Sequence, residues 1–282
     1  MLKPVLLHDE IEIWLVDHDR LAPLAVLDRY RQILSKEEIT QERKFRSQTD
    51  RLGYAVTRIA QRLLLSRYVG MDPEALTFSR TSHGRPGLSC PPAERCGLDF
   101  NISHDGTLTV FGLIKGGAIG VDVMTTPARS SYMNVARRFF CPVETEALDK
   151  LAEPLRARRF MEFWTLKEAY VKACGAGLSI PLNSFYFVLE EPGKIDFFPQ
   201  SPSHDISISW NFWQFRPAPE VLIAICVRQE SVPGSSVNLR EFHPFKPENL
   251  IACSPHRISR KHFSRLPTPS ANTRVARHAD GP

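Results

Sequence analysis

Alternating apolar and polar residues predict several strands in the first half of the chain. Residues 11–16 alternate well enough for an opening strand, and a short strand is expected near 76–79, before the turn-rich sequence 83–87. Residues 98–104 and 107–113 form two further runs, and Asp105-Gly106 between them is a hairpin signal. This hairpin puts Ser103 and His104 at a strand end, where side chains can reach a ligand, although a strand-end histidine is often structural.

Helical periodicity fills the intervals between these strands. Ser35 followed by acidic residues is typical of a helix start, and that helix should run towards Phe45. A second helix is expected over about 50–68, with Gly70 ending it. Two more are expected at 131–139 and 143–151, followed by strands near 185–189, 194–198, 206–213 and 222–227.

Residues 119–124 read as an apolar strand that contains one carboxylate. Alternation puts Gly120, Asp122 and Met124 on the same side of this strand. The missing side chain at Gly120 leaves room beside Asp122 for something bulky to approach. An aspartate in such a strand needs a partner. A metal ion and a turn-capping role are both consistent with it.

The segment 163–172 reads as part of a helix that Gly175 and Gly177 end. Trp164, Glu168 and Lys172 recur at intervals of four residues, so they stack on one face, and that arc is otherwise largely apolar. An ordinary surface pair of Glu168 and Lys172 would explain the pattern. A metal, a phosphate or an internal ion pair would also compensate charges in such a place.

These elements predict an α/β (α+β) fold whose body divides near Lys115. The expected units are an N-terminal half at 1–115, a C-terminal half at 116–230 and a tail at 231–282. The tail carries eight Lys and Arg against three acidic residues, whereas the body is balanced, so the net charge of +5 belongs to the tail. Because the tail is also rich in proline and poor in apolar periodicity, we expect it to be disordered, and its charge does not indicate specific nucleic-acid binding by the fold.

Cysteine spacing and hydropathy also indicate the cellular compartment of the protein. The six cysteines show no CxxC pair and no zinc-ligand spacing, and no stretch resembles a membrane span or a signal peptide. These features predict a cytoplasmic protein with reduced cysteines and no membrane partner. For the basic tail, a solvated segment and a weak electrostatic contact with nucleic acid or an anionic membrane are both open interpretations.

Three motifs in order resemble the 4′-phosphopantetheinyl transferases of the Sfp type: Asn101-Ile-Ser-His104, Gly120-Val-Asp122, and Trp164-Thr-Leu-Lys-Glu168-Ala-Tyr-Val-Lys172. Gly84-Arg85-Pro86, Arg138-Phe139-Phe140 and Glu144 match the patterns between them, and the likeness covers about 10–228. The resemblance implies a monomer of two pseudo-symmetric halves with the active site in the cleft between them. It implies Mg²⁺-dependent transfer of phosphopantetheine from coenzyme A to a serine of an acyl, peptidyl or aryl carrier protein, with release of adenosine 3′,5′-bisphosphate.

The resemblance also assigns roles to residues. Asp122 and Glu168 match metal ligands, and Glu168 also matches the base for the carrier serine, acting directly or through water. Lys172 matches the lysine on the pyrophosphate. Ser103 and His104 match the family's phosphate and nucleotide contacts. Arg85 and Pro86 match the loop that borders the adenine. Trp164 and Lys167 are expected to support the helix.

Two departures from the family pattern affect these expectations. Met124 stands where many relatives carry a further carboxylate, and its thioether suits Mg²⁺ poorly, so we expect water or Asp105 to complete the metal shell. Glu38 and Gln41 stand where relatives use basic residues for the 3′-phosphate of coenzyme A; Arg43 and Arg51 are candidate substitutes. Two other readings are a catalytically weak or inactive module that binds carrier protein or nucleotide, and a metal-dependent phosphohydrolase with water as acceptor.

Overall fold

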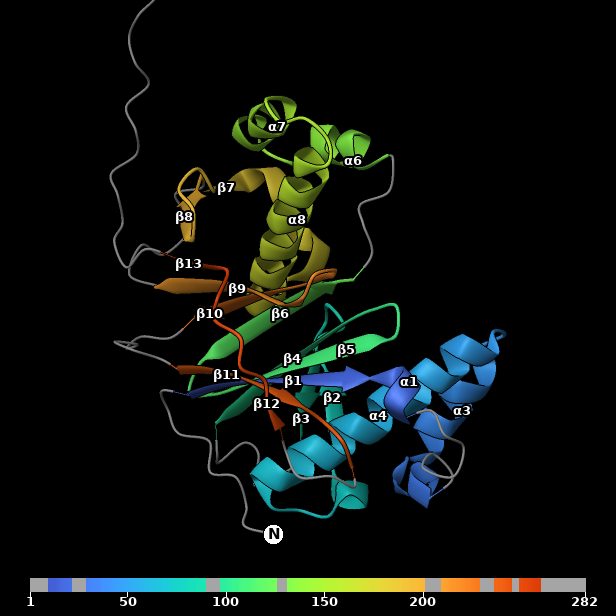
Figure 1. Ribbon diagram of the computed structural model, residues 1–282. Helices are drawn as coiled ribbons and strands as arrows, with labels where there is room; N and C mark the ends of the chain where they lie inside the picture. Colours follow the sequence, from blue (N-terminus) through green and yellow to red (C-terminus); the bar gives the residue numbers. More distant parts are fainter. Residues whose placement is uncertain are drawn as a thin grey trace, which may run out of the picture.

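The computed structural model describes residues 10–21, 29–89, 97–125, 131–200, 209–228, 236–244 and 249–259. Within these ranges it is a mixed α/β structure, as the sequence predicts, with two large sheets and a small hairpin. Figure 1 shows the sheets in the middle of the molecule and the long helices outside them. No helix in these ranges has the length and apolar character needed to cross a membrane.

The first half begins with β1 (Glu10–Asp17), the short α1 (His18–Leu21) and a 3₁₀ turn at Arg31–Ile33. Helix α3 (Lys36–Lys44) starts at Ser35, whose side chain accepts a hydrogen bond from the Glu38 amide while the Glu38 carboxylate accepts one from the Ser35 amide. Helix α4 (Gln48–Val69) ends at Gly70, which adopts the left-handed conformation at φ 70°. Both helices are confirmed close to their expected bounds because the sequence contains these caps.

A second group of elements completes the first sheet. A 3₁₀ turn at Pro73–Ala75 leads into the hairpin of β2 (Phe78–Arg80) and β3 (Pro86–Leu88). The predicted hairpin of β4 (Leu98–Asp105) and β5 (Leu108–Lys115) turns at Gly106. β5 then pairs antiparallel with β1.

The second half starts with β6 (Ala118–Met124), α6 (Tyr132–Phe139), α7 (Pro142–Asp149) and the long α8 (Leu155–Cys174). After 3₁₀ turns at Gly177–Ser179 and Leu182–Ser184 come the remaining strands: β7 (Phe185–Val188), β8 (Lys194–Pro199), β9 (Trp210–Ala218) and β10 (Val221–Arg228). These elements agree with the sequence expectations, except that residues 206–208 of the expected strand lie outside the described ranges.

The expectation of a disordered tail over 231–282 is wrong for the part of it that the structure describes. β11 (Ser236–Glu241) pairs parallel with β1, and β12 (Asn249–Leu250) pairs with β11. β13 (Arg257–Ser259) lies between β9 and β8 in the second sheet. Short strands that pair with existing strands need only a few apolar residues of their own, so composition gave too little signal to predict them. Residues 260–282 lie outside the described ranges.

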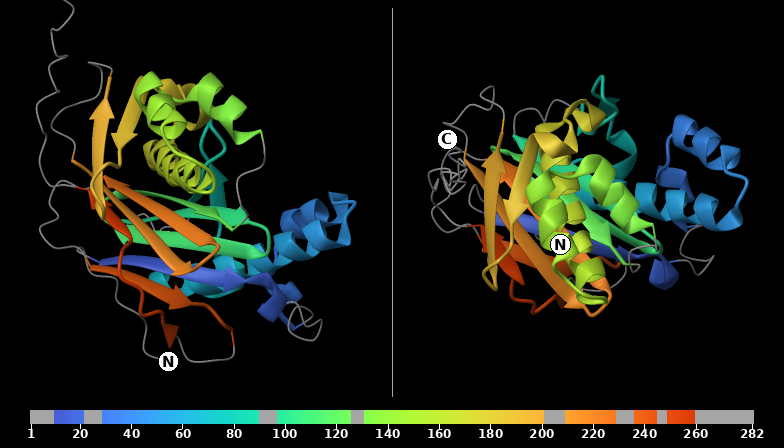
Figure 2. Two further views of the ribbon diagram at one scale, coloured as in Figure 1. Left: turned by 45° about the horizontal axis from the view of Figure 1, so that its top comes forward. Right: turned by 90° about the horizontal axis from the view of Figure 1, so that it is seen from above.

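The two large sheets form the inner layers of a four-layer arrangement. Their strand orders are β12-β11-β1-β5-β4 and β6-β10-β9-β13-β8-β7. One apolar cluster lies between the sheets and includes Ile13 and Val110 from the first and Val121 and Ile225 from the second. A second cluster joins α4 to the outer face of the first sheet, and a third joins α8 to the second sheet. Figure 1 shows α4 and α8 on opposite sides of the paired sheets, and the left view of Figure 2 agrees.

Candidate functional site

The site forms where β4, the edge strand of the first sheet, runs beside β6, the edge strand of the second. Every second residue of β4 turns a polar side chain towards β6. The contacts are Asp99 Oδ2 with the Ile119 amide (2.9 Å), Asn101 Oδ1 with the Val121 amide (3.0 Å), Ser103 Oγ with Asp122 Oδ1 (2.9 Å) and Asp105 Oδ2 with the Thr125 amide (2.6 Å). Side chains thus replace the backbone ladder between two strand edges. We call this row of contacts the β4–β6 seam.

Lys172 completes a triangle at the middle of the seam. Its ammonium group lies 2.6 Å from Asp122 Oδ1 and donates to Ser103 Oγ at 2.9 Å. Asp122 is 6% exposed. Burial raises the pKa of its carboxyl, while Lys172 and Ser103 oppose that shift and the charge of Asp105 adds to it. The predicted need of Asp122 for a partner is therefore met within the chain by an ammonium group and a hydroxyl.

Glu168 lies on α8 one turn before Lys172 and is half-buried. Burial raises the pKa of its carboxyl; the neighbouring charge of Asp122 raises it further, and Lys172 opposes both. A carboxylate with a raised pKa is a better base than an exposed glutamate. The structure thus brings Glu168 close to Asp122 and Lys172.

The close approach of α8 to β6 explains Gly120. A Cβ atom at this position would lie 2.0 Å from the Ala169 carbonyl oxygen and 2.4 Å from the Ala173 amide nitrogen. The bulky neighbour that the sequence led us to expect beside Asp122 is thus the backbone of α8 itself. Because Gly120 allows this contact, the face of α8 that carries Glu168 and Lys172 reaches Asp122.

Arg85 fixes the C-terminal end of the same helix. Its guanidinium donates to the carbonyl oxygens of Lys172 and Ala173 at the C-terminus of α8, and it pairs with Asp99 Oδ2 at 2.6 Å. A cation at a helix C-terminus also stabilises the helix dipole. The hydrogen bonds of this guanidinium thus join the β2–β3 hairpin to α8 and the seam, a role that the sequence analysis missed.

The neighbouring residues Ser103 and His104 are turned apart by the strand. Ser103 faces the seam and is buried, whereas His104 is exposed on the other face of β4. Burial is the main cause that lowers the pKa of His18, and the charge of His104 lowers it further. The two rings therefore lie near each other. Only Ser103 of this pair lies at the triangle with Asp122 and Lys172.

The interior of the second half supports α8 through a buried ion pair. Lys167 is fully buried; its ammonium lies 2.8 Å from Glu144 Oε2 and donates to the carbonyl oxygens of Leu182 and Phe185. Trp164 stacks on Phe160, with ring centroids 5.9 Å apart. These contacts agree with a supporting role for Lys167 and Trp164.

A separate cavity of about 740 Å³ lies between the first helices and the β2–β3 hairpin. Its lining includes Glu38 and Gln41 on α3, Arg58 and Arg62 on α4, and Arg80 and Pro86 on the hairpin. The lining contains neither Arg43 nor Arg51, the two substitutes considered from the sequence, and Arg51 instead donates to the Phe45 carbonyl. Glu38 pairs with Arg62 at 2.8 Å. The basic residues of this cavity thus come from α4 and the hairpin.

The two carboxylates of Asp122 and Glu168 supply only part of the ligand shell of a hard divalent ion. Among the residues that the structure describes, no three His, Cys, Asp or Glu side chains gather closely enough to hold a metal by themselves. Asp122 and Glu168 supply two carboxylates, and Mg²⁺ in proteins is commonly held by one or two carboxylates together with water and substrate phosphates. Asp105 has its Oδ2 atom committed to the Thr125 amide and hydroxyl.

Comparison with known proteins gives matches along most of the body. Residues 25–113 match the family model described as 4′-phosphopantetheinyl transferase, N-terminal, and residues 118–226 match that of the 4′-phosphopantetheinyl transferase superfamily. The protein slr0495 of Synechocystis sp. is 36% identical over 61% of this chain and 68% of its own length. The 4′-phosphopantetheinyl transferase HetI of Nostoc sp. is 30% identical over 79% of this chain and 89% of its own. The 4′-phosphopantetheinyl transferase Sfp of Bacillus subtilis is 28% identical over 60% of this chain and 72% of its own length.

Proposed function

Since the chain belongs to the 4′-phosphopantetheinyl transferase family, we propose that it moves 4′-phosphopantetheine from coenzyme A to a serine of an acyl, peptidyl or aryl carrier protein. The observation that carries this proposal is the meeting of Asp122, Glu168 and Lys172 at the seam. A carboxylate with a raised pKa beside an ammonium group suits attack by a hydroxyl on a pyrophosphate.

In the proposed reaction the carrier serine oxygen attacks the phosphorus that bears the pantetheine group. The bond from this phosphorus to the bridging oxygen breaks, and adenosine 3′,5′-bisphosphate leaves. Glu168 accepts the hydroxyl proton, directly or through water, as the new bond forms. Lys172 supplies positive charge to the departing phosphate, and Ser103 holds the Lys172 ammonium in place.

We propose Asp122 and Glu168 as the residues that would hold Mg²⁺, with water or Asp105 completing the shell in the absence of a carboxylate at Met124. The ion would neutralise charge on the pyrophosphate. Because Lys172 already lies against Asp122 Oδ1, the ammonium and the ion would share this carboxylate.

We place the nucleotide of coenzyme A in the cavity beside α3, α4 and the β2–β3 hairpin. Pro86 lies in its wall, in agreement with the adenine-bordering role of that loop, and Arg58 and Arg80 bring positive charge to it. Arg85 acts in this proposal as a positioning residue between the cavity and α8, and His104 as a phosphate contact from the exposed face of β4. The enzyme would act as a cytoplasmic monomer without specific nucleic-acid or membrane partners.

The direct test incubates the protein with apo carrier protein, coenzyme A and Mg²⁺, and follows the carrier by mass spectrometry. A gain of about 340 Da, the mass of a phosphopantetheine group, is expected. Carriers from fatty-acid, polyketide, nonribosomal-peptide and aminoadipate-reductase systems should be compared. Binding of carrier or coenzyme A without any mass gain would indicate an inactive module. Release of phosphate without carrier would indicate a phosphohydrolase.

A further inference from the structure

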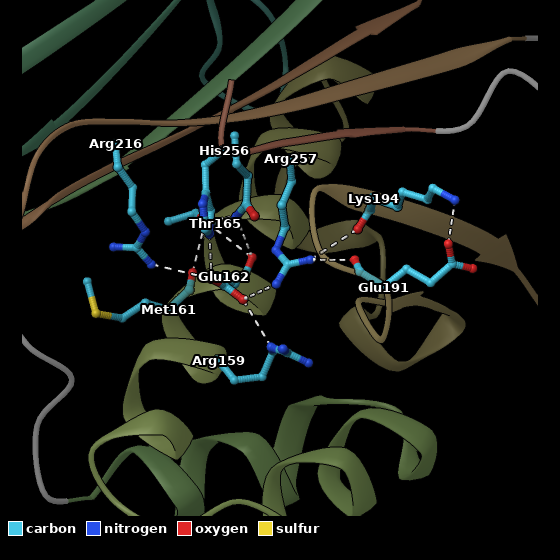
Figure 3. Close-up of polar contacts among 10 residues, drawn as sticks. Arg159, Met161, Glu162, Thr165, Glu191, Lys194, Arg216, His256 and Arg257 are labelled. Carbon is cyan, nitrogen blue, oxygen red and sulfur yellow. Dashed lines mark hydrogen bonds and ion pairs between the residues drawn. The ribbon is translucent and has the colours of Figure 1, made fainter. Parts of the chain in front are cut away.

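Glu162 is a buried acidic residue of α8 that the proposed mechanism does not use. It is 6% exposed, and its carboxylate contacts four basic side chains, as Figure 3 shows. The contacts are Arg159 at 3.0 Å, His256 at 3.0 Å, Arg216 at 3.4 Å and Arg257 at 3.5 Å. They reach Glu162 from α8 itself, from β9, and from residues 249–259, which we call the C-terminal strap.

The C-terminal strap is also fixed to the second sheet through its backbone and through Arg257. The His256 amide donates to the Gln214 carbonyl at 2.7 Å, and the Arg257 guanidinium donates to the carbonyl oxygens of Glu191 and Lys194. Gln214 in turn donates to the Glu162 carbonyl at 2.9 Å and to Thr165 Oγ1 at 3.1 Å. The strap, β9 and α8 therefore share one polar network.

The electrostatics of the cluster make Glu162 its centre. Burial alone would raise the pKa of this carboxyl, but the hydrogen bond of His256 and the charges of Arg257 and Arg159 outweigh burial and lower it to about 2. The carboxylate is therefore ionised at neutral pH. Arg159 and Arg216 repel Arg257, and the negative charge of Glu162 opposes this repulsion.

The same helix that Glu162 anchors also presents the reactive face. Glu168 lies six residues after Glu162, and Lys172 lies ten residues after it. All three belong to the single α-helix Leu155–Cys174. A shift of α8 at Glu162 would move both side chains relative to Asp122, because an α-helix moves nearly as a rigid rod. The strap lies beyond residue 226, where the superfamily match ends, so it is an addition to the matched body.

We propose that the C-terminal strap positions α8 for catalysis by holding Glu162 through His256 and Arg257. Glu162 is a positioning residue in this proposal, since it acts through Glu168 and Lys172. The kinetic consequence rests on the proposed transferase function, whereas the hold on α8 does not.

The test compares wild type with Glu162→Gln, which keeps the shape of the side chain and removes its charge. Transfer should be measured well below the melting temperature, on protein shown by circular dichroism to be folded. We expect kcat to fall by about tenfold or more, because small misplacements of reacting groups cost rate, while KM for coenzyme A stays within about twofold. A purely structural role would lower the melting temperature and leave kcat unchanged.

Four further variants guard against misfolding and against nonspecific effects. His256→Gln removes a half-exposed partner and should give a smaller loss of kcat in a protein that folds. Arg257→Lys keeps the charge and should retain more activity than Arg257→Gln. Lys194→Gln is the matched control, because the ion pair of Lys194 with Glu191 is exposed and adjoins the cluster; this variant should behave as wild type.

Hydrogen exchange gives a readout that does not need activity. Amides of residues 164–172 should exchange faster in Glu162→Gln than in wild type or Lys194→Gln. Unchanged exchange together with unchanged kcat would overturn the positioning role and leave the transferase proposal intact. If wild type transfers nothing to any carrier, the transferase proposal fails, and exchange alone decides whether the strap holds α8.

Discussion

Lys172 of α8 and Asp122 of β6 form an ion pair, 2.6 Å from Nζ to Oδ1, at the place where the edges of the two large sheets meet. The pair joins the helix to the strand, and Ser103 adds the neighbouring strand of the first sheet. The three side chains together thus link both halves of the protein, and loss of the Lys172–Asp122 pair should affect both stability and chemistry.

Replacing Lys172 should leave Asp122 buried without its cation. We expect Lys172→Met to lower the free energy of unfolding at pH 7 by about 3 kcal/mol, the low end for breaking a buried pair, since the lysine is partly exposed. Urea denaturation measures this. Lys44→Met, at an exposed position of α3, is the control, and Asp122→Asn combined with Lys172→Met should recover part of the loss. Full stability of Lys172→Met alone would contradict the pair's role.

Removing the charge of Glu168 should stop transfer without unfolding the protein. We expect Glu168→Gln to reduce kcat by at least about 100-fold, the range associated with loss of a general base, with a melting temperature close to that of wild type. The mass-spectrometric carrier assay measures transfer. Glu146→Gln, at an exposed site on α7, should keep full activity; substantial transfer by Glu168→Gln would exclude the base role.

Adding one methyl group at Gly120 should push α8 away from β6. Gly120→Ala is expected to destabilise the protein by about 3 kcal/mol or more, because the Cβ atom would overlap backbone atoms that cannot yield individually. The matched control is Gly53→Ala inside α4, where the nearest atom, His18 Nδ1, would lie 3.4 Å away. That variant should be neutral or stabilising by up to about 1 kcal/mol, since alanine favours helix. Similar melting temperatures for the two variants would contradict the packing explanation.

The stability contributed by Glu162 should depend on pH in the acidic range. Its pKa in the folded protein, about 2, lies below its usual value of 4.5, so the contribution is fully present above about pH 4.5 and is lost as the pH falls towards 2. It amounts to roughly 3 kcal/mol at neutral pH. The difference in free energy of unfolding between wild type and Glu162→Gln should therefore shrink from pH 6 to pH 3. A difference that is constant over this range would show that the charge is not what stabilises the fold.

The cavity beside α3 and α4 predicts how the donor is recognised. If Arg58 and Arg80 bind the 3′-phosphate, coenzyme A should have a lower KM than 3′-dephospho-coenzyme A, and replacing either arginine by Gln should narrow the difference. Arg43→Gln serves as control, because Arg43 is exposed and outside the lining. Equal KM values for the two donors in wild type would place the 3′-phosphate elsewhere.

The sequence predicted what depends on local signals. The cap at Ser35, the stop at Gly70 and the Asp105-Gly106 turn each act over a few residues, so their elements are found as expected. Asp122, Glu168 and Lys172 could be grouped because the family motifs carry them. The alternation of β6 also indicated correctly that Gly120 and Asp122 share a face, but it could not identify the approaching group as α8.

The missed features depend on contacts between distant segments. Nothing in the spacing of Arg85 indicates that its guanidinium reaches the end of α8, 87 residues away. The partners of Glu162 could not be foreseen because His256 and Arg257 lie in a region whose proline content and charge suggested disorder. Composition averages over a window, whereas β13 requires only three residues in the right register between two strands.

The parallel pairing of β11 with β1 has a consequence for synthesis of the protein. Glu10 of β1 lies opposite Ser236 of β11, so β1 leaves the ribosome long before the strand that covers its outer edge. At ordinary translation rates the delay is roughly 10–45 seconds, during which the nascent chain carries an open strand edge next to a completed β1–β5 pairing. Such an edge is a site for pairing with other chains. We therefore expect the nascent chain to benefit from ribosome-associated chaperones, and expression stopped before residue 236 to yield aggregates.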